Sequence, residues 1–224
     1  MMSNIATNIL SLRKMLPGSV TIVAVSKMQH VAALREAYDA GQRVFGENKV
    51  QELVNKQGQL PADIAWHFIG HLQTNKVKMI VPFIDLIHSI DSLHLLREVD
   101  REAKKHNRKI NCLLQIKIAR EETKFGLSPE DAGVLLDNPE YVSLHHINII
   151  GVMGMGSFSD DHEVVRKEFK RLHDCYENLK ALYFKGHGSF DVISMGMSGD
   201  FMVAIEEGST MVRIGTSIFG ERQY

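Results

Sequence analysis

Short apolar runs alternate along the chain with segments in which apolar residues recur every three or four positions. The short runs predict buried strands, and the longer spacing predicts amphipathic helices. Strands are expected near residues 21, 44, 66, 87, 113, 149, 192 and 212, each followed by a helix or by the chain end. Because no two runs lie close enough for a hairpin, the eight strands are expected to be parallel.

The helical segments carry recognisable start and stop signals. The first spans residues 3–16, where Ile5, Ile9 and Leu12 share one face and Pro17 ends the run. Ser92 is the expected N-cap of a later helix. Further helices are expected over residues 31–40, from about 48, and over 72–80, 93–106, 129–137, from about 160 and 199–208.

Eight strand–helix units in 224 residues fit a compact α/β fold, a single (β/α)8 TIM barrel. An open, doubly wound parallel sheet is the alternative, although such sheets usually have fewer strands. No linker rich in proline, glycine or serine divides the chain, so residues 1–224 are expected to form one domain.

Composition excludes several classes of function. Lysine plus arginine number 26 against 27 aspartates and glutamates, without a basic block, so nucleic acid is not an expected partner. Cys112, Cys175 and the 11 histidines lack disulfide or metal-ligand spacing, so no metal is expected. No signal-peptide pattern occurs, and no apolar run approaches the roughly 20 residues of a membrane helix. We expect a cytoplasmic protein that does not contact a membrane.

The first strand, within TIVAVSKMQH, leads directly to Ser26 and Lys27. Parallel α/β proteins place their chemistry at the carboxyl ends of strands, and a desolvated lysine amine can attack a carbonyl to form a Schiff base. A solvated lysine after a strand is the simpler interpretation of Lys27 alone, so its role depends on which residues converge with it.

Closure of a barrel would bring the last strand beside the first. Arg213 lies at the end of that last strand, and Gly215 and Thr216 open the loop that follows. Ser194 and Ser198 follow the seventh strand. Loops after strands seven and eight commonly bind phosphate in such barrels, because glycine lets backbone N–H groups approach the oxygens. The sequence therefore predicts a phosphate site near Lys27.

Two histidines flank the end of the third expected strand. His67 and His71 lie in WHFIGHLQ and could act as an acid or base. We favour a positional or hydrogen-bonding role, since no carboxylate partner is apparent nearby in the sequence.

Seven ordered motifs together resemble the pyridoxal phosphate (PLP) homeostasis protein family. The resemblance extends from the first strand to Arg222 and implies a barrel of the alanine racemase N-terminal type, PLP fold type III, without the second β-domain of the racemases. The motifs are VAVSK, FGEN, WHFIGHLQTNK, KFGL, GVMGMG, SMGMSGD and STMVRIGTSIFG.

The resemblance also implies roles for single residues. Lys27 would carry PLP as an internal aldimine, Arg213 would face the pyridine nitrogen, and Ser194, Gly215 and Thr216 would hold the phosphate. An arginine beside the pyridine nitrogen can only donate, so it keeps that nitrogen unprotonated and weakens the cofactor as an electron sink.

Two further roles follow from the same resemblance: Asn48 near the ring or its 3-hydroxyl, and Met153 near the ring face. The implied function is intracellular PLP homeostasis without evident turnover, by a monomer whose partners are PLP and, transiently, PLP-dependent enzymes. An amino-acid racemase on the same barrel is the alternative, but racemases take a second base from an extra β-domain for which the eight units leave no room. A phosphosugar-binding barrel would leave Lys27 and Arg213 without a linked purpose.

Overall fold

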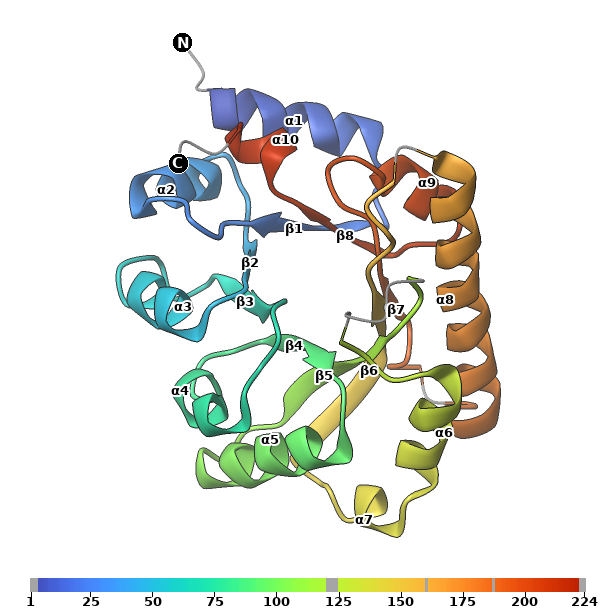
Figure 1. Cartoon of the computed structure of the whole chain (residues 1–224). Helices are drawn as coiled ribbons and strands as arrows, with labels where there is room; N and C mark the ends of the chain where they lie inside the picture. Colours follow the sequence, from blue (N-terminus) through green and yellow to red (C-terminus); the bar gives the residue numbers. More distant parts are fainter. Residues whose placement is uncertain (1–3, 120–124, 160, 187, 222–224) are drawn as a thin grey trace.

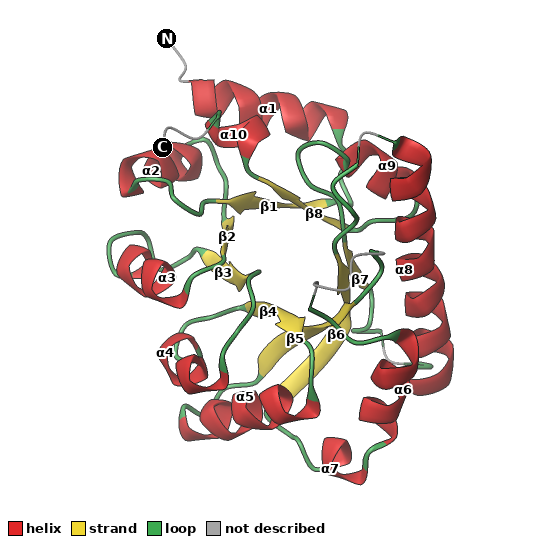
Figure 2. Ribbon diagram, in the orientation of Figure 1, coloured by secondary structure: helices red, strands yellow, loops and turns green. Residues whose placement is uncertain are grey.

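The computed structural model describes residues 4–119, 125–159, 161–186 and 188–221. Parallel strands close into a barrel in sequence order, with helices around the outside (Figures 1 and 2). The closed barrel confirms the expected fold over the open sheet. The strands are β1 (Thr21–Val25), β2 (Val44–Glu47), β3 (Ala65–Phe68), β4 (Leu86–Ile90), β5 (Ile110–Ile116), β6 (Ile147–Gly154), β7 (Val192–Ser194) and β8 (Met211–Ile214).

The helices occupy most of the expected segments. Ser92 is confirmed as an N-cap, because its Oγ accepts the N–H of Leu95 at 3.2 Å. The helices are α1 (Asn4–Met15), α2 (Val31–Asp39), α3 (Val50–Gln57), the 3₁₀ turn η1 (Thr74–Lys76), α4 (Val77–Ile80), α5 (Leu93–Lys105), α6 (Pro129–Asp137), α7 (Pro139–Val142), α8 (His162–Tyr183), α9 (Phe201–Glu206) and α10 (Thr216–Phe219).

Three helical segments differ from expectation. The segment 72–80 is a 3₁₀ turn followed by the four-residue α4, and the short α7 was not expected. After β8 the chain forms α10 rather than an open loop, since the N–H groups of Ile218 and Phe219 both donate to Gly215 O at 2.9 Å. Asp160, the expected start of α8, lies outside the described residues, as do Lys124 of the KFGL motif and Arg222.

Closure depends on the pairing of β1 with β8. The two strands pair in parallel along four residue pairs, from Thr21 with Met211 to Ala24 with Ile214. This pairing sets the segments that follow β1 and β8 side by side at one rim of the barrel.

Alternate strand residues face two different environments. One set faces outward and packs under the helices, as do Phe45, Trp66 and Ile87. The other set faces the barrel interior, where a small apolar cluster forms around Val23 and Leu113. Buried polar side chains, among them His67, His88 and Arg213, lie beside this cluster and build much of the site described below.

The first and last described helices lie side by side in Figure 1. Asn8 Nδ2 of α1 donates to Ile218 O of α10 at 3.0 Å. Helix α1 therefore fastens the segment after β8 to the barrel. None of the helices in the described ranges is long and apolar enough to span a bilayer.

Candidate functional site at the carboxyl-terminal mouth

The carboxyl ends of all the parallel strands meet at one rim, and Lys27 lies there two residues beyond β1. Its side chain is half-buried, and Ser26 before it is fully buried. Gly215, directly after β8, packs against β1 so closely that a Cβ on it would lie 3.3 Å from Val25 O. The segments carrying Lys27 and Gly215 are therefore neighbours, although they are far apart in the sequence.

The backbone after Lys27 is held in an unusual conformation. Met28 has a φ of +63°, in the left-handed region that non-glycine residues rarely adopt. Its N–H donates to Glu52 Oε1 of α3 at 2.6 Å. Glu52 also accepts from Lys56 Nζ at 2.6 Å, and Lys56 donates to Ser26 O at 2.7 Å. Helix α3 thus fixes the residues on both sides of Lys27.

Asn48 follows β2 at the same rim and is half-buried. A Cβ on Gly70, in the loop after β3, would lie 2.3 Å from Asn48 O, a separation that no side chain could accept. Glycine at position 70 therefore lets the loop after β3 pack directly against the backbone of Asn48.

Arg213 is a buried cation in β8, only 4% exposed. Its Nη1 donates to Ser194 O at 2.8 Å and to Ser194 Oγ at 2.7 Å, and its Nη2 donates to Gly154 O at 2.9 Å. Three of its five N–H groups are thus committed, and among the described residues it has no carboxylate at ion-pair distance. Burial lowers the pKa of Arg213 to about 10, so it stays protonated at neutral pH.

The structure separates two serines, Ser194 at the end of β7 and Ser198 in the segment after it. Ser194 is fully buried, and its Oγ lies against Arg213 and 3.1 Å from His88 Nδ1. Ser198 lies against the start of α10, because its Oγ accepts hydrogen bonds from the N–H groups of Gly215 and Ser217, each at 3.3 Å. Ser194, which the resemblance assigns to the phosphate, therefore lies between Arg213 and His88. Ser198, which sequence reasoning considered only as a further donor, lies instead against the segment that opens α10.

Two histidines lie inside the barrel below Arg213. His88 Nε2 is 3.0 Å from His67 Nδ1, and both rings are buried. Burial lowers the pKa of each, most strongly for His88, so both are neutral at neutral pH. His67 also has a carboxylate partner, since its Nε2 lies 3.6 Å from Asp85 Oδ2. Sequence reasoning missed both Asp85 and His88, because each becomes a neighbour of His67 only when the strands pair.

His71 lies in the loop after β3 and is more exposed. Its ring stacks on Phe125 with centroids 4.1 Å apart, and its Nδ1 lies 3.4 Å from Asp91 Oδ2. His71 therefore links the loops that follow β3, β4 and β5. This arrangement agrees with a positional role, and Asp91 is a partner that the sequence did not reveal.

Met153 belongs to the apolar cluster inside the barrel and is 1% exposed. It pairs with Ser194 in the register of β6 and β7, which places it one strand away from Ser194 and two from Arg213. Its side chain therefore presents an apolar surface beside the buried polar side chains of the interior.

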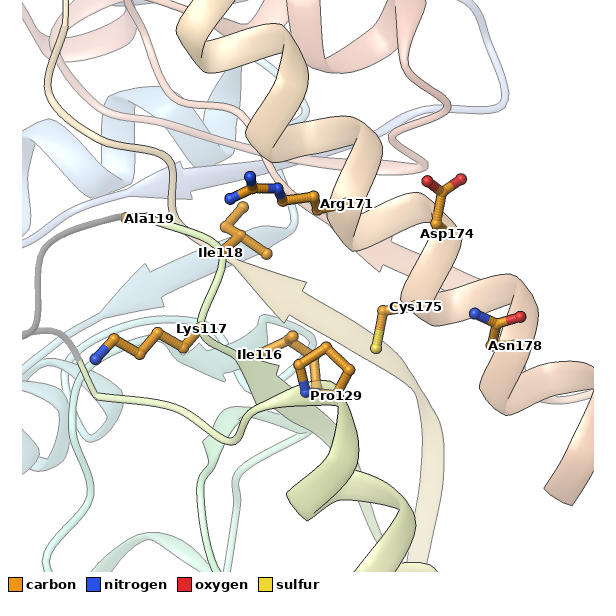
Figure 3. A pocket seen from close by; sticks show the side chains of 9 residues that line it. All are labelled: Ile116, Lys117, Ile118, Ala119, Pro129, Arg171, Asp174, Cys175 and Asn178. Carbon is orange, nitrogen blue, oxygen red and sulfur yellow. The ribbon is translucent and has the colours of Figure 1, made fainter.

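A separate pocket of about 430 Å³ opens outside the barrel, between the end of β5, α6 and α8 (Figure 3). It shares no residue with the mouth just described. The pocket is lined by Ile116, Lys117, Ile118, Ala119, Pro129, Arg171, Asp174, Cys175 and Asn178.

Within the described ranges, no group of three or more histidine, cysteine, aspartate or glutamate residues could hold a metal ion.

Comparison with solved structures agrees with this architecture. The chain is similar to PipY of Synechococcus elongatus PCC7942, with a TM-score of 0.90 and 38% identity over 96% of this chain and 100% of that chain for the form without PLP. The form with PLP bound gives a TM-score of 0.87 and 37% identity at the same coverage. An alanine racemase of Clostridium difficile shares only the fold, with a TM-score of 0.76 and 15% identity over 99% of this chain and 57% of that chain.

Sequence comparison identifies the family. The model of the alanine racemase N-terminal domain matches residues 1–223. A pyridoxal phosphate homeostasis protein of Aquifex aeolicus is 40% identical over 204 residues, which are 91% of this chain and 87% of that protein. One from Synechocystis is 39% identical over 92% of this chain and 94% of that protein. The chain therefore belongs to the pyridoxal phosphate homeostasis protein family, whose barrel is that of the alanine racemase N-terminal domain.

Proposed function

We propose that this protein binds pyridoxal 5′-phosphate at the carboxyl-terminal mouth of its barrel and serves PLP homeostasis in the cytoplasm. The observation that carries the proposal is Arg213, a buried cation with two uncommitted N–H groups and, among the described residues, no carboxylate partner. A pyridine nitrogen accepts hydrogen bonds and so suits those donors. The names of the relatives and the PLP-bound form of PipY support the same ligand.

The residues at the mouth fit the other parts of this cofactor. Lys27 supplies an amine that can bind the aldehyde covalently. Helix α3 fixes the loop that carries this lysine. Ser198 and Thr216 offer hydroxyl donors for the phosphate at the start of α10, and the N–H of Gly215 could turn from Ser198 Oγ to the phosphate when it binds. Arg213 would donate a hydrogen bond to the ring nitrogen.

Two more residues complete the proposed site. Asn48 follows β2 at the same rim and offers an amide to the ring or its 3-hydroxyl. Met153 provides an apolar surface for the ring face, and its polarizable sulfur suits contact with an aromatic ring.

The site favours a carrier or regulator over an enzyme. Bound PLP supplies an aldehyde that condenses with amines and a ring that can withdraw electrons. Arg213 donates hydrogen bonds but accepts none, so the ring nitrogen facing it carries no proton. An unprotonated ring withdraws electrons weakly, and retention of the cofactor is then favoured over reaction at a bound amino acid.

The racemase alternative has less support. Likeness to the alanine racemase at 15% identity extends to the fold alone, whereas the relatives at 39–40% identity are named homeostasis proteins. We further propose that residues 1–224 act as one domain, as a monomer, with transient contact to PLP-dependent enzymes.

Titration of the purified protein with PLP, followed by absorbance, tests the proposal. The wild-type protein should develop a visible band that borohydride abolishes, and peptide mapping should then place the pyridoxyl group on Lys27. Lys27→Ala should lose the band. Lys76→Ala is the matched control, because Lys76 is exposed in η1 and should leave the band unchanged. A pyridoxyl group found on Lys76 or Lys117 would contradict the assignment.

A further inference from the structure

A row of polar side chains runs through the barrel interior from Arg213 to the opposite rim. Arg213 Nη1 lies 2.7 Å from Ser194 Oγ, Ser194 Oγ lies 3.1 Å from His88 Nδ1, and His88 Nε2 lies 3.0 Å from His67 Nδ1. The row ends where His67 Nε2 lies 3.6 Å from Asp85 Oδ2. Asp85 directly precedes β4, so it lies at the amino-terminal rim, across the barrel from Lys27.

The two ends of this row determine the direction of every hydrogen bond within it. Arg213 can only donate, and an ionised carboxylate can only accept. The pKa of Asp85 is lowered, mainly by its interaction with His67, so this carboxyl is ionised at neutral pH. Both histidines are neutral and carry one N–H each, because burial lowers the pKa of each ring.

Only one arrangement satisfies all four contacts. His67 carries its proton on Nε2 and presents it to Asp85, so its Nδ1 accepts from His88 Nε2–H. His88 Nδ1 then accepts the hydroxyl hydrogen of Ser194, and Ser194 Oγ accepts from Arg213. If the bonds between Ser194, His88 and His67 ran the other way, Arg213 and His88 would both donate to Ser194 Oγ. It would also leave the buried hydroxyl hydrogen of Ser194 without an acceptor among the described residues.

We infer that Asp85 is a positioning residue for the mouth of the barrel, acting through His67, His88 and Ser194 on the orientation of Arg213. Across 3.6 Å the Asp85 carboxylate attracts the Nε2 proton of His67, which selects one tautomer of each histidine and keeps Ser194 Oγ available to Arg213. The direction of the row follows from these contacts together with the ionised state of Asp85 and the neutral state of both histidines. Its effect on PLP rests on the proposed function.

Long-range ¹H–¹⁵N spectra of the histidine side chains in the ligand-free protein test the direction of the row. Variants His67→Gln and His88→Gln assign the two resonances. In the wild-type protein both rings should be protonated on Nε2 only. Asp85→Ala should abolish this single tautomer, and Asp85→Asn should preserve it, because the partial negative charge of the amide oxygen still attracts the Nε2 proton of His67.

Asp100→Ala is the matched control. Asp100 lies 3.6 Å from His146 Nδ1, the same separation as in the His67–Asp85 pair, but His146 has no contact with the interior row among the described residues. Protonation of His67 or His88 on Nδ1 in the wild-type protein would overturn the inference. Tautomers unaffected by Asp85→Ala, or equally affected by Asp100→Ala, would do the same.

A second measurement addresses the mouth itself. Asp85→Ala should weaken PLP roughly two- to tenfold, the effect of about one net hydrogen bond, while Asp85→Asn and Asp100→Ala should bind like the wild type. Wild-type affinity in Asp85→Ala would contradict the link from Asp85 to Arg213. If the wild-type protein binds no PLP, the proposed function fails, and the tautomer measurement still decides the direction of the row.

Discussion

Lys56 Nζ donates a hydrogen bond to Glu47 Oε1 across 2.7 Å, and the two side chains are 6% and 0% exposed behind the Lys27 loop. The same carboxylate oxygen accepts from Ser26 Oγ at 2.6 Å. Burial raises the pKa of Glu47, and the contact with Lys56 opposes that rise. The pair therefore joins β1, β2 and α3 at the base of the proposed cofactor lysine.

Replacing Lys56 with methionine should strongly destabilise the protein. The substitution leaves Glu47 buried without its cation, and Glu47 Oε2 already has no hydrogen-bond partner among the described residues. Breaking a buried ion pair from one side typically costs about 3–5 kcal/mol. Urea unfolding measures the loss, with the exposed Lys78→Met as control. The double variant Lys56→Met/Glu47→Gln should recover part of the stability, and an unchanged midpoint in the single variant would show that the pair contributes little.

Ser194 at the end of β7 and Ser198 after it should differ in their effects on cofactor binding. Ser198→Ala and Thr216→Ala should weaken PLP by about 1.5–3 kcal/mol each, the usual effect of one hydrogen bond to a charged group, and should affect pyridoxal much less. Ser194→Ala should weaken PLP and pyridoxal equally, because Ser194 contacts Arg213. Fluorescence or absorbance titration with both ligands measures the difference. A loss confined to PLP in Ser194→Ala would restore that serine to the phosphate site.

Stability should fall as the pH drops below about 6.5, because of the two interior histidines. Their pKa values are lowered from 6.5 in the folded protein, so the unfolded chain binds protons in a pH range where the folded chain does not. The free energy of unfolding then rises with pH up to that value, by at most about 1.4 kcal/mol per pH unit for each histidine.

Urea unfolding between pH 5 and pH 7 checks this dependence. His88→Gln should show a shallower slope than the wild type, because one proton fewer distinguishes the two states. His94→Gln, which changes an exposed histidine of α5, should keep the wild-type slope. Equal slopes in all three proteins would mean that the interior histidines do not take up protons on unfolding.

The protein should show no meaningful racemization of alanine, serine or other common amino acids. In the proposed site Arg213 would leave the ring nitrogen unprotonated, so negative charge at the substrate Cα would be poorly stabilised. Incubation in deuterium oxide followed by chiral analysis measures both exchange and inversion, with an authentic alanine racemase as the positive control. Cells that lack the protein should instead have disturbed PLP pools. Robust exchange with inversion would favour the enzyme over the carrier.

Local pattern alone determined most of the fold. The strand positions, the Ser92 cap and the helix over 129–137 were predictable, because hydrophobic spacing and capping depend only on residues near in sequence. Eight strands without hairpins then implied a barrel. Helix α10 could not be predicted in this way, since four residues are too few to show a helical period.

The composition of the site was decided only by tertiary structure. Ser194 and Ser198 lie four positions apart around the end of one strand and carry the same hydroxyl, so the sequence could not tell which one contacts Arg213 and which one contacts the start of α10. His88 is 21 positions from His67 and 106 from Ser194, yet both lie within 3.1 Å of its ring. Strand order and inward direction bring these groups together when the barrel closes, and neither property can be deduced from the spacing of any single segment.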